Sequence, residues 1–112
     1  MALHEYMKNS KIIEEMYLYL LEKGYKEISS SIDIAKSITE FVFEVKTEGN
    51  ELSKNLEKDL YCCRDIELEE YGWELTDSHC VCELTTLGIL VNDYKITEDN
   101  DLCKIVLHRK KI

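Results

Sequence analysis

Residues 94–108 read YKITEDNDLCKIVLH, and residues 102–108 within this stretch have the strongest strand composition in the chain. Its second half is rich in β-branched and aliphatic side chains, which are typical of a strand. A two-residue turn at residues 99–100 would place Ile96 opposite Cys103, so that both side chains lie on one face. The stretch therefore predicts an antiparallel hairpin near the end of the chain.

The segment before it predicts another hairpin, over residues 71–84. A two-residue turn at Asp77 and Ser78 brings three pairs of residues opposite one another: Leu75 with Cys80, Trp73 with Cys82, and Tyr71 with Leu84. All six side chains fall on one face, as a half-buried sheet requires.

The first half of the chain shows mainly helical patterns. Apolar residues recur at helical spacing over residues 12–21, after N-cap candidates and before Gly24, which predicts a helix over residues 10–23. This helix is apolar nearly all round, so we expect it to be either a core helix or partly an interface, for example in a homodimer. Weaker patterns indicate a short helix near residues 31–38, a strand near residues 40–47 and a helical segment over residues 51–63. A helix over residues 39–47 is the alternative, because the apolar residues Ile34, Ile38, Phe41 and Val45 also keep a helical spacing.

These patterns predict an α+β fold, with two to three N-terminal helices packed on an antiparallel sheet of C-terminal hairpins. The 112 residues contain no proline, four glycines and no linker-like stretch, which indicates a single domain over residues 1–112. The longest apolar run, residues 16–21, is too short to cross a bilayer, and the first residues do not resemble a signal peptide. We therefore expect a cytoplasmic protein.

The five cysteines suggest free, buried thiols in a reducing compartment, because their number is odd. His79, Cys80 and Cys82 are close in sequence, but a single residue between the two thiols is an unusual spacing for zinc, and their face is assigned to the core. An acidic surround disfavours a reactive thiolate. With no nucleotide-binding or hydrolase motif present, we expect no metal, no cofactor and no enzymatic activity.

Charge is distributed unevenly along the chain. There are 14 Lys and Arg against 23 Asp and Glu, a formal net charge of −9. Residues 51–101 hold fourteen acidic and four basic residues, and no Lys or Arg occurs between Arg64 and Lys95. Such a field repels phosphate and attracts basic surfaces, and salt weakens it. A solvated acidic face that only keeps the protein soluble is the alternative interpretation.

The order of three helices and then a hairpin resembles the winged-helix family, and residues 83–88, ELTTLG, are similar to the strand-to-helix segment that follows the wing in many repressors of that family. The resemblance implies a DNA-binding regulator, often dimeric, whose third helix enters the major groove. It implies DNA contacts from the third helix and the wing tip, at Ser53, Lys54, Asn55, Lys58, Asp77, Ser78 and His79. The sequence departs from this pattern because residues 39–49 are too long for the turn between two helices, and because the wing is acidic where phosphate contacts need Lys or Arg.

Alternate positions of an extended acidic stretch place carboxylates roughly 7 Å apart, close to the phosphate spacing along one nucleic-acid strand. In size and charge the chain resembles phage-encoded inhibitors of host defence, anti-CRISPR proteins among them. We therefore predict a binding protein that occludes a basic surface of a partner on nucleic-acid machinery, without binding nucleic acid or membrane itself. Trp73 would be its aromatic anchor if its side chain is exposed, and a core position between Tyr71 and Leu75 is the alternative. The predicted partner-binding residues are Asp65, Glu67, Glu69, Glu70, Trp73, Glu74, Asp77 and Glu83.

Overall fold

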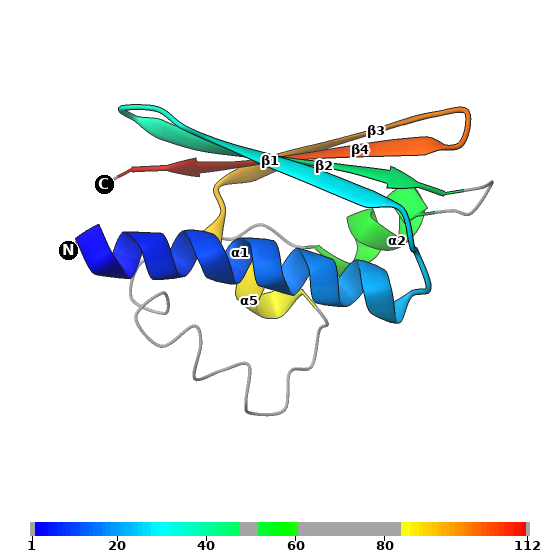
Figure 1. Ribbon diagram of the computed structural model, residues 1–112, viewed down its shortest axis with the longest axis horizontal. Coiled ribbons are helices and arrows are strands. Elements are labelled where there is room, and N and C mark those ends of the chain that lie inside the picture. Colours follow the sequence, from blue (N-terminus) through cyan, green and yellow to red (C-terminus); the bar gives the residue numbers. More distant parts are fainter. Residues whose placement is uncertain (1, 48–51, 61–83, 112) are drawn as a thin grey trace.

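The computed structural model describes residues 2–47, 52–60 and 84–111. Its elements, in chain order, are helix α1 (Ala2–Glu22), strands β1 (Ile28–Ile34) and β2 (Ile38–Lys46), helix α2 (Leu52–Asp59), helix α5 (Thr85–Leu90), and strands β3 (Asp93–Asp99) and β4 (Leu102–Lys110). The strands form one sheet, and the helices of the described part lie together on one of its faces (Figure 1). The predicted α+β class is confirmed.

The sheet is antiparallel throughout, with strand order β1-β2-β4-β3. Along β2 and β4, buried residues that face the helices alternate strictly with residues on the outer face of the sheet. Phe41 and Phe43 of β2 pair with Leu107 and Ile105 of β4, and all four side chains are fully buried. Strands β1 and β3 are the two edges, so the β2–β4 pair forms the centre against which the helices pack.

The helices complete the core from below the sheet. Helix α1 buries Ile12, Met16 and Leu20, helix α2 buries Leu52 and Leu56, and helix α5 buries Leu87 and Leu90. None of the helices in the described residues is both long and apolar enough to cross a membrane.

Helix α1 ends as the sequence predicts. Gly24 has φ of +95°, a left-handed conformation that glycine adopts without steric cost. The Tyr25 N–H donates to the Leu20 carbonyl and the Gly24 N–H to the Leu21 carbonyl, both at 3.1 Å, which together form a Schellman motif. The predicted helix over residues 10–23 is confirmed, and it begins eight residues earlier, at Ala2.

The short helix predicted near residues 31–38 is wrong, because residues 28–34 form strand β1. Ile28, Ile32 and Ile34 lie on one face of β1, which pairs with the strongly strand-forming β2, and this pairing overrides the weak helical spacing. The strand predicted near residues 40–47 is confirmed as β2. A hairpin therefore occupies the place where the winged-helix order requires its second helix.

The C-terminal hairpin is confirmed in kind but not in register. Ile96 lies opposite Ile105 rather than Cys103, because the turn falls at Asn100 and Asp101. Asn100 takes a left-handed φ of 55°, which asparagine tolerates better than most residues. A shift of two residues keeps every side chain on its predicted face.

The remaining predictions differ mainly in the order of the elements. The helical segment predicted over residues 51–63 is α2, which ends at Asp59 in the described chain. Helices α2 and α5 lie between the two hairpins along the sequence, rather than before the sheet. The hairpin predicted over residues 71–84 lies outside the described residues, except for Leu84.

One buried ion pair joins α1 to the sheet. The side chain of Arg109, on the inner face of β4, is fully buried. Its Nε and Nη2 donate to the two carboxylate oxygens of Glu5 at 2.9 and 3.0 Å, and Nη1 donates to the Leu90 carbonyl at 2.7 Å. The guanidinium thus bridges the start of α1, the end of α5 and the end of β4.

We expect Glu5→Ala to lower the free energy of unfolding by about 3 kcal/mol, because it leaves the Arg109 charge buried without its partner. Glu14→Ala, which removes an exposed carboxylate from the same helix, should cost less than about 0.5 kcal/mol. Urea unfolding followed by circular dichroism measures both changes. Equal costs would contradict a structural role for the ion pair.

Candidate functional site

The predicted partner-binding residues all fall in residues 61–83, outside the residues that the structure describes. They are Asp65, Glu67, Glu69, Glu70, Trp73, Glu74, Asp77 and Glu83. His79, Cys80 and Cys82, the group considered for zinc, lie in the same segment. We call residues 61–83 the acidic segment, since they hold seven acidic residues and one basic residue.

The acidic segment is attached to the core at both of its ends. Leu60, just before it, is 2% exposed, and its N–H donates to the Leu56 carbonyl at 2.7 Å. Leu84, just after it, is 1% exposed, and its carbonyl accepts the Gly88 N–H at 2.9 Å. Leu60 and Leu84, the described residues on either side of the acidic segment, are therefore both part of the core.

The described part of the protein carries almost no net charge. Residues 2–47, 52–60 and 84–111 together hold fourteen acidic and thirteen basic residues. Almost all of the excess of −9 is therefore contributed by the undescribed residues, and most of it by the acidic segment.

Helix α1 keeps several apolar side chains in solvent on the side away from the sheet. Tyr6 is 63% and Leu21 is 56% exposed, and Met7 and Leu18 are each 46% exposed. A shallow hollow lies along the first turns, lined by Tyr6, Met7, Ser10, Lys11 and Glu14. The apolar residues of this helix therefore fall into two groups: Ile12, Met16 and Leu20 lie in the core, and the four residues named above are exposed.

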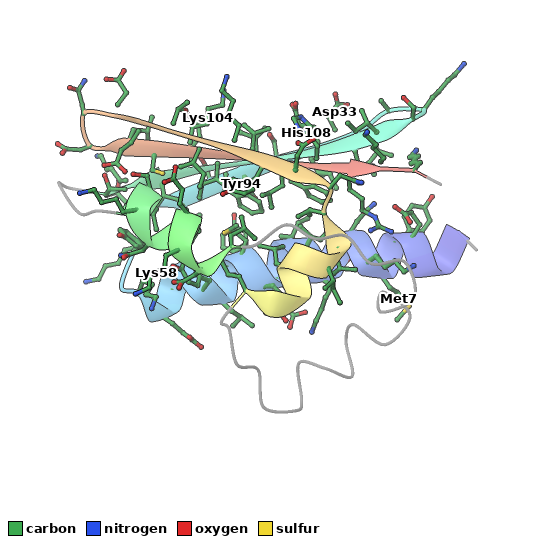
Figure 2. The ribbon with its side chains drawn as sticks, turned by 180° about the vertical axis from the view of Figure 1, so that it is seen from behind. Met7, Asp33, Lys58, Tyr94, Lys104 and His108 are labelled. Atoms are coloured by element: carbon green, nitrogen blue, oxygen red, sulfur yellow. The ribbon has the colours of Figure 1, made fainter. Side chains whose placement is uncertain are left out.

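A histidine sits between two carboxylates on the outer face of the sheet (Figure 2). His108 of β4 contacts Asp93 of β3 through Nδ1 at 2.8 Å and Glu40 of β2 through Nε2 at 3.0 Å. Asp33 of β1 lies opposite Glu40 in the strand register, so the row of polar residues extends across all four strands. The hydrogen bond to Glu40 is the main cause that raises the pKa of His108, Asp93 adds to it, and partial burial opposes it.

Cys103 is the one cysteine within the described ranges, and its environment makes it unreactive. It is fully buried on the inner face of β4. Burial, with a smaller effect from Glu98, raises the pKa of its thiol to about 11, so almost no thiolate forms at neutral pH. No three His, Cys, Asp or Glu side chains of the described residues are placed to share a metal ion.

Comparison with protein families, with curated proteins and with solved structures finds no match for this chain. Inference about its function therefore depends on its own residues. Sequence reasoning missed the histidine row, because Glu40, Asp93 and His108 come together only through strand pairing. It also missed edge strand β1, whose signal was the alternation of Ile28, Ser30, Ile32 and Ile34.

We expect His108 to titrate above the ordinary histidine pKa of about 6.5. Because its pKa is raised by folding, its contribution to stability is fully present below the unfolded pKa and is lost as pH rises through the folded pKa. His108→Gln should therefore destabilise the protein more at about pH 6 than at about pH 9. Glu40→Gln should lower the pKa of His108, measured from its imidazole resonances by NMR. A wild-type pKa at or below the ordinary value would contradict this.

We expect Cys103 to resist alkylation in the native protein. Iodoacetamide at mildly alkaline pH should leave it unmodified until urea is added, because the thiol is buried and protonated. Peptide mass spectrometry before and after unfolding reads out the modification. Rapid labelling of Cys103 in the folded state would show that the strand opens readily.

Proposed function

We propose that this protein is a non-enzymatic binding protein whose acidic segment occludes a basic surface on a partner protein. The observation that supports this proposal is the uneven distribution of charge: the described residues carry almost no net charge, whereas the acidic segment between Leu60 and Leu84 holds seven acidic residues and one basic residue. A concentrated acidic field gives fast, salt-sensitive association with a basic surface. Trp73 is the proposed anchor within the segment.

The partner class we propose is a protein with a phosphate-binding groove, as found on nucleic-acid machinery. Such grooves are lined by Lys and Arg and bind through many charge contacts. A carboxylate-rich segment competes for them by presenting negative charge in place of phosphate. This is the sense in which the protein would act as a nucleic-acid mimic, in the manner of anti-CRISPR inhibitors.

The rival proposal is direct DNA binding through helix α2. Lys54, Asn55 and Lys58 are exposed on this helix, as the winged-helix resemblance requires. A carboxylate stands at each end, however. Glu98 accepts the Ser53 N–H at 3.2 Å, and Asp59 accepts the Tyr19 hydroxyl at 2.7 Å. Negative charge at both ends weakens phosphate contacts, so we rank this function second.

The test is a tagged pull-down from the source cell with charge-reversal variants. Changing Glu67, Glu69 and Glu70 to Lys should abolish capture of the partner, because it reverses the field of the acidic segment. Captured proteins are identified by mass spectrometry after nuclease treatment and across a series of salt concentrations. A partner of the proposed kind is a basic protein that stays captured after nuclease treatment and is released as the salt concentration rises.

The matched control changes Glu14, Glu22 and Glu57 to Lys on the exposed scaffold, which alters the net charge by the same amount. We expect this variant to keep the partner. If both variants lose it, net charge alone is responsible and the proposed site is wrong. If Lys54→Glu with Lys58→Glu is the change that abolishes binding, and nuclease removes the captured material, the DNA-binding function is supported instead.

A further inference from the structure

Strand β1 is an edge strand whose outward backbone groups have no partner strand in the described chain. The Lys46 N–H donates to the Glu27 carbonyl, and the Ala35 N–H donates to the Ile38 carbonyl. In an antiparallel pair, hydrogen-bonded positions alternate along each strand. The odd-numbered residues of β1 therefore direct their N–H and C=O groups to β2. The even-numbered residues, Ile28, Ser30, Ile32 and Ile34, direct theirs away from the sheet.

This edge also lacks the features that normally keep strands from pairing. Natural edge strands are protected by lysines, prolines, bulges or inward-pointing charges. The other edge, β3, carries Asp93, Lys95, Glu98 and Asp99. Strand β1, with the sequence ISSSIDI, has one charged residue, Asp33, whose position is on the outer face of the sheet, away from the helices. Six of its seven residues are exposed.

The face of β1 that points toward the helices is apolar and only partly covered. Ile32 is 40% and Ile34 is 48% exposed, although their neighbours across the strand pair, Phe41 and Thr39, are fully buried. Tyr17 of α1 reaches β1 through a 2.8 Å hydrogen bond between its hydroxyl and that of Ser30. Figure 1 looks toward the β1 edge, with β1 in front of the other strands and α1 below the sheet.

We propose that β1 pairs with β1 of a second copy of this chain, antiparallel about a two-fold axis at Ser31. This register sets Ile28 opposite Ile34 of the second copy and Ser30 opposite Ile32, so all four outward N–H and C=O pairs are satisfied. On the outer face it sets Asp33 opposite a serine, Ser29, which can donate to the carboxylate. No like charges face each other, whereas an axis at Asp33 would oppose two carboxylates.

The area that this edge pairing would bury indicates a weak dimer. Seven strand residues span about 23 Å, and a sheet with one helix layer is about 20 Å deep, which gives about 450 Å² per copy. The total of about 900 Å² lies below the roughly 1,000 Å² expected of a stable interface and within the range of weak, transient ones. We therefore expect a dimer that dissociates in the micromolar range rather than a permanent one.

Cysteine cross-linking tests the register. In the proposed pairing Ser31 faces Ser31 of the second copy at a non-hydrogen-bonded position, where Cα atoms are about 4.5 Å apart, within disulfide range. Ser31→Cys should form a covalent dimer in a glutathione buffer. Ser29→Cys is the matched control, because two copies of residue 29 would lie more than about 10 Å apart. Peptide mass spectrometry separates these links from those of the natural cysteines.

Sedimentation equilibrium of the full chain from about 1 to 500 μM tests the association itself. Ile32→Lys places an inward-pointing charge on the edge and should weaken the dimer at least tenfold. Since Ile32 is exposed, the fold should persist, as circular dichroism can verify. Thr97→Lys on the β3 edge is the control and should leave the dimer unchanged.

Each remaining outcome overturns the proposal. If the protein is monomeric at every concentration, β1 does not pair with a second copy, and an extended segment of another protein becomes the alternative partner for this edge. Equal weakening by Ile32→Lys and Thr97→Lys, or equal cross-linking at residues 29 and 31, shows that association does not use this edge in this register. Failure here does not affect the proposed function, because binding through the acidic segment is measured with other variants.

Discussion

The ion pair between Glu5 and Arg109 joins helix α1 to the end of the central strand β4. The buried guanidinium of Arg109 donates hydrogen bonds to both carboxylate oxygens of Glu5 in α1 and to the Leu90 carbonyl in α5. Arg109 itself lies at the end of the central strand β4. A buried ion pair contributes little net stability over a well-packed apolar pair, because both charges lose hydration. What it does provide is a specific contact, since Nε and Nη2 of Arg109 meet both carboxylate oxygens of Glu5 at the start of α1.

The orientation of α1 decides which of its residues remain available. With Glu5 directed to Arg109, the stripe of Ile12, Met16 and Leu20 faces the sheet, and Tyr6 and Leu21 remain in solvent. The helix lies across the inner face, so the edge at β1 is only partly covered, and Ile32 and Ile34 stay accessible. The orientation of α1, set by the ion pair together with the buried apolar stripe, is thus consistent with both a closed centre of the core and an accessible edge at β1.

The sequence predicted most of what local patterns control. The Schellman end of α1, strand β2 and the C-terminal hairpin all follow from residues close to one another in the chain, such as Gly24 and Asn100. It failed where distant pairing decides. Residues 31–38 fit a weak helix until β2 is placed beside them, and the row of Glu40, Asp93 and His108 exists only in the folded sheet. The predicted partner-binding residues lie outside the described chain, so they remain a prediction.

The two proposed interactions differ in physical character, and their effects oppose each other. Pairing of β1 buries backbone groups and isoleucines and brings together two chains of net charge −9, so added salt screens repulsion and favours the dimer. Engagement of a basic partner by the acidic segment is a charge attraction, which added salt weakens. A dimer would also present two acidic segments, and a partner with two basic sites would then bind with an avidity that one copy lacks. Edge pairing would therefore give this small scaffold a second binding segment without requiring any change in the first.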